Sequence, residues 1–260
     1  MKAREIMEEL YGRSSYKGET VDTCKIGDPE VEVSRIAVTM FATPEVIRDA
    51  RDWGAQLLIV HEPLFYNHED RHSREQIETE KRIMLVSSEM AVYRYHDHAH
   101  ATRPDTICAG MVKAMGLPGS ARYTSDLSKV YIRLRQPMTP RQLAYILEKS
   151  LGLSHIRIAG AADAYCTQIC GMFGTPPGVF EELKKDDCEI VLTGETCEWS
   201  VAEYVRDAAQ LGYRKALLVL GHEGSERDGM RLTAAQLAET YPQIEVRYFE
   251  CEEVYSYTDS

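Results

Sequence analysis

Two short apolar segments of this sequence lead into a histidine. Residues 57–60 (LLIV) run directly into His61-Glu62, and residues 216–220 (ALLVL) precede His222 by one residue. Apolar runs without polar alternation are typical of strands that are buried on both faces of a parallel sheet. A similar helical pattern precedes each run. The two stretches therefore indicate two related α/β units that carry polar side chains at the carboxyl ends of their strands, where ligands of such folds bind.

Strand-like and helix-like patterns alternate along most of the chain. The predicted strands span residues 35–41, 57–60, 91–95, 129–135, 155–159, 165–173, 189–193, 216–220 and 244–249. The predicted helices span residues 1–10, 43–54, 74–88, 105–115, 139–151, 179–185, 198–211 and 227–240. Such alternation is typical of α/β folds. Because the pattern starts again at Lys129 after the turn at residues 116–119, we predict two α/β lobes, residues 1–125 with 226–260 and residues 126–225.

The charge and the cysteine content limit the partners and the compartment of the protein. The net charge is −11 over 260 residues, and such a field repels phosphate backbones, so we expect no nucleic-acid partner. The longest apolar runs have strand length, so we expect no membrane association. The seven cysteines include no Cys-x-x-Cys pair. This pattern indicates a reducing, cytoplasmic environment and not a disulfide framework.

Histidine and glutamate residues gather where three predicted strands end. They are His61 and Glu62, then His96, His98 and His100, and finally His222 and Glu226. Imidazole nitrogen and carboxylate oxygen are the ligands that divalent transition metals recruit at neutral pH. A lone histidine at a strand end is usually a hydrogen-bonded surface residue, but three such groups together predict a metal site. We expect this site in a cleft between the two lobes.

Four segments resemble motifs of the Nif-three-like family, often labelled GTP cyclohydrolase I type 2. LLIVHEPL (57–64) resembles "LIIxHHPL", YHDHAHA (95–101) resembles "YxxHTNxDA", and TGE (193–195) and GHEGSE (221–226) resemble "TGE" and "GHxxTE". The segments follow the family's order. The resemblance implies a hexameric ring and two divalent metal ions per chain. It also implies a set of metal ligands, which are His61, Glu62, His96, His100, His222 and Glu226.

Several positions depart from the family pattern. Glu62 replaces the second histidine of "HHPL", and His100 replaces the aspartate of the next motif. If both side chains bind the same metal ion, the exchange leaves the number of ligands and the formal charge of that metal site unchanged. Phe41 stands where the family's early strand usually ends in aspartate, and Glu198 and Trp199 stand near the place of a histidine pair. These last departures weaken any transfer of substrate chemistry.

Two roles stay open at the level of the sequence. His98 would share a face with His100 if the predicted strand continued, and it could then replace His100 as the ligand. Glu195 could position or deprotonate a metal-bound water, or it could be a carboxylate that stabilises a helix N-terminus. His68 lies in a polar stretch that is typical of a solvated loop.

The predicted centre suits metal-dependent hydrolysis. Two metal ions roughly 3.5–4 Å apart polarise a carbonyl or phosphoryl oxygen and lower the pKa of a bridging water toward about 7. Glu226 is the candidate bridging carboxylate. We expect a small phosphorylated or heterocyclic substrate, a nucleotide included. The resemblance implies GTP cyclohydrolase activity, although no G-x-x-x-x-G-K-[ST] loop supports nucleotide binding. Zinc, manganese, iron, cobalt and nickel all fit the ligands. The alternative is a non-catalytic, hexameric metal-binding scaffold, storage or regulatory protein.

Overall fold

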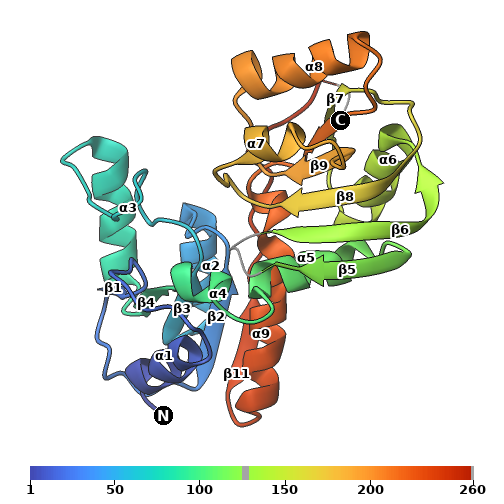
Figure 1. Ribbon diagram of the computed structural model, residues 1–260. Coiled ribbons are helices and arrows are strands. Elements are labelled where there is room, and N and C mark those ends of the chain that lie inside the picture. Colours follow the sequence, from blue (N-terminus) through green and yellow to red (C-terminus); the bar gives the residue numbers. More distant parts are fainter. Residues whose placement is uncertain (125–128, 259–260) are drawn as a thin grey trace. The chain divides into compact units, whose positions relative to one another are not determined.

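The chain divides into two compact units (Figure 1) in a computed structural model that describes residues 1–124 and 129–258. Unit 1 comprises Met1–Thr106 and Gly229–Glu252, and unit 2 comprises Ile107–Asp228 and Glu253–Ser260. Each unit has its own β-sheet and its own helices, so the predicted α/β class with two lobes is confirmed. In the described residues, no helix combines the length and the apolar character needed to cross a bilayer.

The sheet of unit 1 contains five strands in the order β1-β4-β3-β2-β11. The strands are β1 (Cys24–Ile26), β2 (Arg35–Thr39), β3 (Leu57–Val60), β4 (Ala91–Arg94) and β11 (Glu245–Tyr248). All neighbouring strands are parallel except β1, which is antiparallel to β4. Thr39, Val60 and Arg94 are in register at the ends of β2, β3 and β4. The residues that follow these three therefore leave the sheet at one edge.

Local sequence signals set the bounds of the helices in unit 1. The helices are α1 (Ala3–Gly12), α2 (Pro44–Trp53), α3 (Gln76–Ser87), α4 (Asp97–His100) and most of α9 (Arg227–Thr240). At the start of α2, the Thr43 side chain accepts a hydrogen bond from the backbone N–H of Val46, and proline occupies the first turn. Gly54 ends this helix with a φ of 81°, which favours glycine.

The sheet of unit 2 contains six strands in the order β5-β6-β8-β9-β10-β7. The strands are β5 (Gly119–Tyr123), β6 (Val130–Met138), β7 (Arg157–Gly160), β8 (Cys166–Met172), β9 (Ile190–Thr193) and β10 (Ala216–Val219). Strands β8, β9 and β10 are parallel, and the other pairings are antiparallel. Met172, Thr193 and Val219 are in register, so the loops after these strands also share one edge.

Helices cover both faces of the sheet in unit 2. They are α5 (Thr106–Met115), α6 (Pro140–Leu151), α7 (Val179–Leu183), the π-helix η1 (Glu198–Ala202) and α8 (Glu203–Gln210). Leu218 packs in one apolar cluster with Leu147 of α6, and Leu217 packs in another with Leu183 of α7. Because neighbouring strand residues point to opposite faces, β10 is buried on both sides, as its continuous apolar run predicts.

The division between the units differs from the predicted boundary at residue 125. Strand β5, which the sequence analysis did not predict, pairs with β6 of unit 2. Met111 and Met115 of α5 pack in an apolar cluster of unit 2. Strand pairing and apolar contacts therefore place the division at Thr106, ahead of the turn on which the prediction relied.

The end of the chain is also divided differently. The prediction placed residues 226–260 with the first lobe, whereas Glu253–Ser260 belongs to unit 2. In this segment the ring of Tyr257 lies 4.3 Å from that of His155, between centroids. Glu253 Oε1 of the same segment accepts a hydrogen bond from the Ser154 N–H over 2.8 Å. Contacts of this kind leave no periodic signal in the sequence, so pattern analysis does not detect them.

Candidate metal centre

The carboxyl ends of two neighbouring strands bring the first predicted ligands together. His61 directly follows Val60 at the end of β3, and His96 follows the end of β4 by two residues. The backbone N–H of Tyr95 donates to the carbonyl of Val60 over 2.9 Å. Pairing of the two strands therefore continues to the point where both histidines leave the sheet.

His61, His96 and His100 form a compact histidine cluster in unit 1. One ring nitrogen of each residue lies within 4.8 Å of a ring nitrogen of the other two. The ring centroids lie 4.7 Å apart for His61 and His96, 5.2 Å for His61 and His100, and 5.1 Å for His96 and His100. His61 and His100 are buried, and His96 is partly buried. Three imidazoles at this spacing could hold a divalent metal ion.

An oxygen atom lies within hydrogen-bond distance of Nδ1 in each of the three rings. The partners of His61, His96 and His100 are, in that order, the Tyr95 carbonyl at 2.9 Å, Asp97 Oδ1 at 3.0 Å and Asp105 Oδ2 at 3.0 Å. A carbonyl or carboxylate at this position selects the tautomer with the proton on Nδ1. The lone pair of Nε2 then becomes available to a metal ion, as in the histidine ligands of many metalloproteins. The donor set of unit 1 therefore fits a metal.

Glu62 places a carboxylate beside the histidine cluster. Its Oε1 lies 3.9 Å from Nε2 of His61, and its side chain is 11% exposed. The backbone N–H of Glu62 donates to the carbonyl of Met40 over 2.9 Å, which fixes the chain direction after β3. Glu62 thus lies on the same side as the ring nitrogen that His61 would offer to a metal.

The electrostatics of this cluster favour neutral imidazole beside carboxylate. Burial lowers the pKa of His61 well below its ordinary value, the neighbouring His96 lowers it further, and Glu62 acts in the opposite direction. Burial alone would raise the pKa of Asp97, but hydrogen bonds from His96 and Thr20 lower it below its ordinary value. Neutral histidine and ionised carboxylate are the protonation states that bind a divalent cation.

His98 points away from the histidine cluster. Its Nδ1 lies 2.8 Å from Asp22 Oδ2, and its ring centroid lies 4.5 Å from that of Tyr11. The predicted strand does not continue here, because residues 97–100 form the short helix α4, in which the N–H of His100 donates to the carbonyl of His96. Residues four apart share a face of a helix, so the structure brings His100 and not His98 to His61.

Asp22 fixes the turn that carries these histidines, and the sequence analysis missed it. Its two carboxylate oxygens accept hydrogen bonds from the backbone N–H groups of His96 (2.7 Å) and His98 (2.8 Å). Its side chain is fully buried. Asp22 is far from both residues in the sequence and belongs to no motif. The adjacent acids of the cluster, Asp97 and Asp105, did carry a signal, namely their closeness in sequence to His96 and His100.

The loop after β3 is largely exposed, as predicted, and its His68 also lies against the histidine cluster. The exposed ring of His68 lies 5.6 Å from that of His96, between centroids. Arg94, whose side chain is fully buried, donates to the backbone carbonyls of His68 (2.7 Å) and His61 (3.3 Å) and to Asp70 Oδ2 (3.2 Å). A buried guanidinium thus fixes this loop beneath the cluster.

Unit 2 carries a second group of predicted ligands, at the carboxyl ends of β9 and β10. Nε2 of His222 lies 3.2 Å from Glu226 Oε2, and Nδ1 of His222 lies 2.7 Å from Glu195 Oε1. The Thr175 hydroxyl lies 3.2 Å from the same Nδ1. Glu226 is buried, whereas the Glu195 side chain is 52% exposed. Glu195 therefore lies where it can orient His222 through Nδ1, with Nε2 facing Glu226.

Gly174 makes room for Glu226, and the sequence analysis missed it. Its φ is +68°, and a Cβ at this position would lie 2.4 Å from Glu226 Oε1. Its backbone N–H donates to the Ser225 hydroxyl over 2.9 Å. Only glycine satisfies both the left-handed conformation and the close approach.

A cavity of about 380 Å³ in unit 2 borders the second group. Its lining includes Glu195, Thr175 and the apolar side chains of Val179, Phe180 and Val201. Glu195 thus contacts both His222 and this cavity, which is large enough for a small organic molecule.

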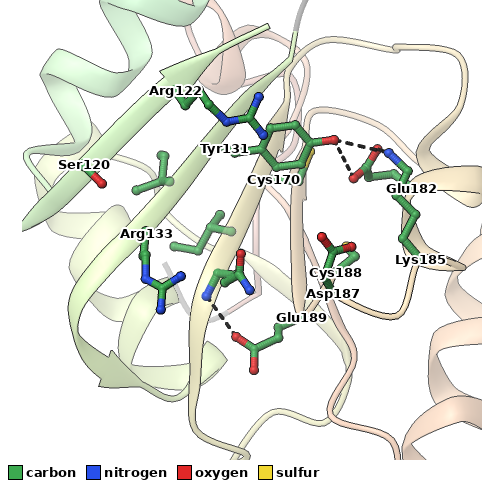
Figure 2. Close-up of a pocket in the computed structure, with 13 residues that line it drawn as sticks. Ser120, Arg122, Tyr131, Arg133, Cys170, Glu182, Lys185, Asp187, Cys188 and Glu189 are labelled. Carbon is green, nitrogen blue, oxygen red and sulfur yellow. Dashed lines mark hydrogen bonds and ion pairs between the residues drawn. The ribbon is translucent and has the colours of Figure 1, made fainter.

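Another cavity in unit 2, of about 360 Å³, has no link to the predicted ligands (Figure 2). The Tyr131 hydroxyl donates to Glu182 over 2.9 Å, Lys185 donates to the same carboxylate over 2.7 Å, and Arg122 lies 4.7 Å from the centre of the Tyr131 ring. None of the predicted metal ligands is among the described residues that line this cavity. Among its charged groups, Lys185 pairs with Glu182, and Glu189 pairs with Arg214 outside the lining.

The Duf34/NIF3 (NGG1p interacting factor 3) family model matches residues 2–254. The chain belongs to this family. The resemblance inferred from four short motifs is therefore confirmed over nearly the whole chain of this Duf34/NIF3 protein.

Curated relatives of this Duf34/NIF3 protein share about a quarter of its residues. It is 25% identical over 213 residues to "GTP cyclohydrolase 1 type 2 homolog" of Clostridium perfringens, covering 77% of this chain and 76% of the relative. It is 24% identical over 225 residues to the protein of the same name in Streptomyces coelicolor, covering 82% and 76%.

Solved structures share the fold. The protein ybgI, described as of unknown function, aligns with a TM-score of 0.80 at 18% identity and covers 97% of this chain and 99% of its own. The Bacillus cereus protein related to NIF3 aligns with a TM-score of 0.78 at 13% identity and covers 99% of both chains. At these identities the structures support the fold alone.

Proposed function

We propose that this Duf34/NIF3 protein binds two divalent metal ions and uses them to hydrolyse a small phosphorylated or heterocyclic compound. The proposed ligands are His61, Glu62, His96, His100, His222 and Glu226. The observation that carries the proposal is the orientation of the imidazoles. Each proposed histidine ligand has an oxygen atom near Nδ1, and this leaves Nε2 for a metal. The ground for assigning both groups to one dinuclear centre is the family resemblance of their motifs.

The donor set limits the metal to a group of ions. Four imidazole nitrogens and two carboxylates suit zinc, manganese, iron, cobalt or nickel, whereas magnesium and calcium prefer oxygen ligands. The two carboxylates contribute a formal charge of about −2, which partly balances two divalent ions and leaves positive charge for an anionic or polarised substrate.

Residues of this chain prepare the site for chemistry. A bound divalent pair supplies a Lewis acid and a water of lowered pKa. Asp97, Asp105 and Glu195 orient the histidine ligands through Nδ1, and burial of His61 keeps one side of the site dry. Glu195 is half exposed, so its second oxygen can also accept a proton from an attacking water. The names of the curated relatives make GTP the first substrate to test.

Metal analysis of untagged protein tests the proposal. We expect about two equivalents of a transition metal per chain, and hydrolysis of one member of a nucleotide and phosphate-ester library with that metal restored. His98→Ala is the matched control, because His98 lies in the same short segment but points toward Asp22. Protein that neither retains nor takes up a transition metal would contradict the proposal. Metal binding without any turnover would favour the non-catalytic scaffold.

The family resemblance also motivates a proposed assembly. We propose a homohexameric ring of about six times 29.5 kDa. Light scattering at micromolar concentration tests it, and a monomeric mass would contradict it.

A further inference from the structure

The cavity of about 380 Å³ in unit 2 borders the proposed metal ligand His222 without including it. Glu195 and Thr175 both line the cavity, and they lie 2.7 Å and 3.2 Å from Nδ1 of His222. In the proposed centre His222 offers its other ring nitrogen, Nε2, to a metal. A molecule in the cavity therefore lies on the Nδ1 side of the imidazole. It is placed for recognition of the substrate beside the metal site.

The charge of the lining disfavours an anion. Among the described residues that line the cavity, Glu195 carries a charge, and no lysine or arginine is present. A carboxylate without a cation in the same lining repels phosphate and carboxylate groups. The net charge of −11 over the whole chain acts in the same direction. The part of a substrate that enters this cavity is therefore not anionic.

An aromatic side chain with a fixed orientation contributes to the apolar wall. The ring of Phe180 on α7 packs edge-on against Tyr204, with centroids 5.1 Å apart and planes at 82°. Lys184 Nζ lies 4.2 Å from the centre of the Phe180 ring. Val201 of the π-helix η1 is also in the lining, and π-helices are rare and occur mostly at functional sites. A fixed aromatic wall favours a planar ligand, because flat rings stack on it with a large contact area.

Polar groups in the lining can pair with a ring that carries N–H and carbonyl groups. The Glu195 carboxylate accepts several hydrogen bonds at once, so it can bind a ligand N–H as well as His222. The hydroxyl oxygen of Thr196, another lining residue, is buried and has no hydrogen-bond partner within residues 1–124 and 129–258. Buried hydroxyls are usually paired. A ligand carbonyl that reaches Thr196 would satisfy a donor that the protein itself leaves unpaired.

We propose that this cavity binds an uncharged, planar heterocyclic ring of the substrate. A ring N–H donates to Glu195, and a ring carbonyl accepts a hydrogen bond from the Thr196 hydroxyl. This assignment rests on the proposed function for the reaction at the metal ions. It narrows the substrate from phosphorylated or heterocyclic compounds to those that contain such a ring. Any phosphate group of the same substrate lies outside the cavity, because Glu195 repels it.

Alkylation of Cys197 reports whether the cavity is occupied. Cys197 lines the cavity and is the exposed member of the seven cysteines, whereas the half-buried Cys24 of unit 1 serves as an internal control. Uracil is a neutral probe with ring N–H and carbonyl groups. At a concentration equal to its dissociation constant, uracil should slow alkylation of Cys197 by N-ethylmaleimide about twofold and leave Cys24 unaffected. Peptide mass spectrometry measures both rates.

Two further probes test the hydrogen bonds and the charge of the site. The compound 1,3-dimethyluracil keeps the ring and both carbonyls but has no N–H group. It should need an at least about threefold higher concentration than uracil for the same protection, because the bond to Glu195 is lost. Inorganic phosphate should not protect Cys197.

Three variants locate the probe in the cavity. Phe180→Leu keeps an apolar side chain without the aromatic ring and should weaken uracil protection about three- to tenfold. Thr196→Val has nearly the same shape as the wild type and should weaken protection at least about threefold. Its melting temperature should not fall, because the hydroxyl has no partner in the free protein. Tyr145→Leu, the matched control, removes an exposed ring from another cavity of unit 2 and should behave like the wild type.

Several outcomes would overturn the proposal. They are failure of uracil to slow alkylation of Cys197, an equal effect on Cys24, and protection by phosphate as strong as by uracil. Unchanged protection in either Phe180→Leu or Thr196→Val would also overturn it. Metal content is measured in parallel. Uracil protection in protein that binds no transition metal would overturn only the proposed function, whereas metal binding without uracil protection would overturn only the ring site.

Discussion

The two candidate ligand groups orient their histidines in the same way, but they differ in how far they are buried. In unit 1 three histidines lie together, and His61 is fully buried. In unit 2 a single histidine, His222, has a side chain that is 23% exposed, and its partner Glu195 is half exposed. Each imidazole has an oxygen atom near Nδ1. From this difference we expect unit 1 to contribute most of the affinity for metal, while His222 and Glu195 of unit 2 are more open to water.

The largest loss of metal binding should come from substitution of His61, the buried histidine of unit 1. His61→Ala should weaken metal binding by more than about 100-fold, because loss of an orienting partner alone costs about 10–100-fold. His222→Ala should have a smaller effect. Elemental analysis after gel filtration checks the order, with His155→Ala as a control from outside both groups and circular dichroism to verify folding. Equal losses in the two variants would break the distinction between the units.

The exchanged pair within unit 1 provides the next test. Glu62→His removes a carboxylate and His100→Asp removes an imidazole, so each single change should lower metal content. The double variant restores the family's ligand types and should bind better than the sum of the single effects. Metal stoichiometry of the three variants measures the coupling. Wild-type metal content in Glu62→Ala would exclude Glu62 as a ligand and end the exchange hypothesis.

Substitution of the carboxylates that orient the histidines should weaken metal binding less than loss of a ligand. The loss should be larger for the more buried carboxylate. Asp105, 8% exposed, lies 3.0 Å from Nδ1 of His100, and Glu195 lies 2.7 Å from Nδ1 of His222. Asp105→Asn should weaken metal binding by about tenfold or more. Glu195→Gln should weaken it less, because water can replace an exposed carboxylate. Competition with a chromophoric chelator measures both constants, and a reversed order would contradict the comparison.

The smallest effect on metal binding should come from substitutions in the loop that contains Gly174, beside Glu226. Gly174→Ala and Gly178→Ala both place alanine at positive φ, at +68° and +89°, with a cost of about 1–2 kcal/mol each. A Cβ at Gly178 has nothing within 4 Å, whereas a Cβ at Gly174 would displace Glu226. Gly174→Ala should therefore lose more stability than Gly178→Ala and also lose metal affinity. Chemical denaturation and metal titration of the pair check this, and equal behaviour would remove the steric role of Gly174.

The sequence alone determined the features that depend on local patterns. Continuous apolar runs indicated the strands β3 and β10. The sequence also predicted a helix over residues 43–54, which the structure shows as α2 with its caps at Thr43 and Gly54. The histidines and glutamates at strand ends, together with four motifs, identified the family and named the candidate ligands. These features are readable because burial on both faces of a sheet and helix capping act on consecutive residues.

Only the tertiary structure decided features that depend on distant residues. Helix α4, and not a continued strand, turned His100 toward His61 and His98 toward Asp22. Pairing of β5 with β6 moved the division between the units, and the sequence carried no signal of the space that Gly174 leaves for Glu226. In each case the deciding interaction is a contact between segments that lie far apart along the chain. Such a contact has no period and no local motif, so it becomes visible only when the chain has folded.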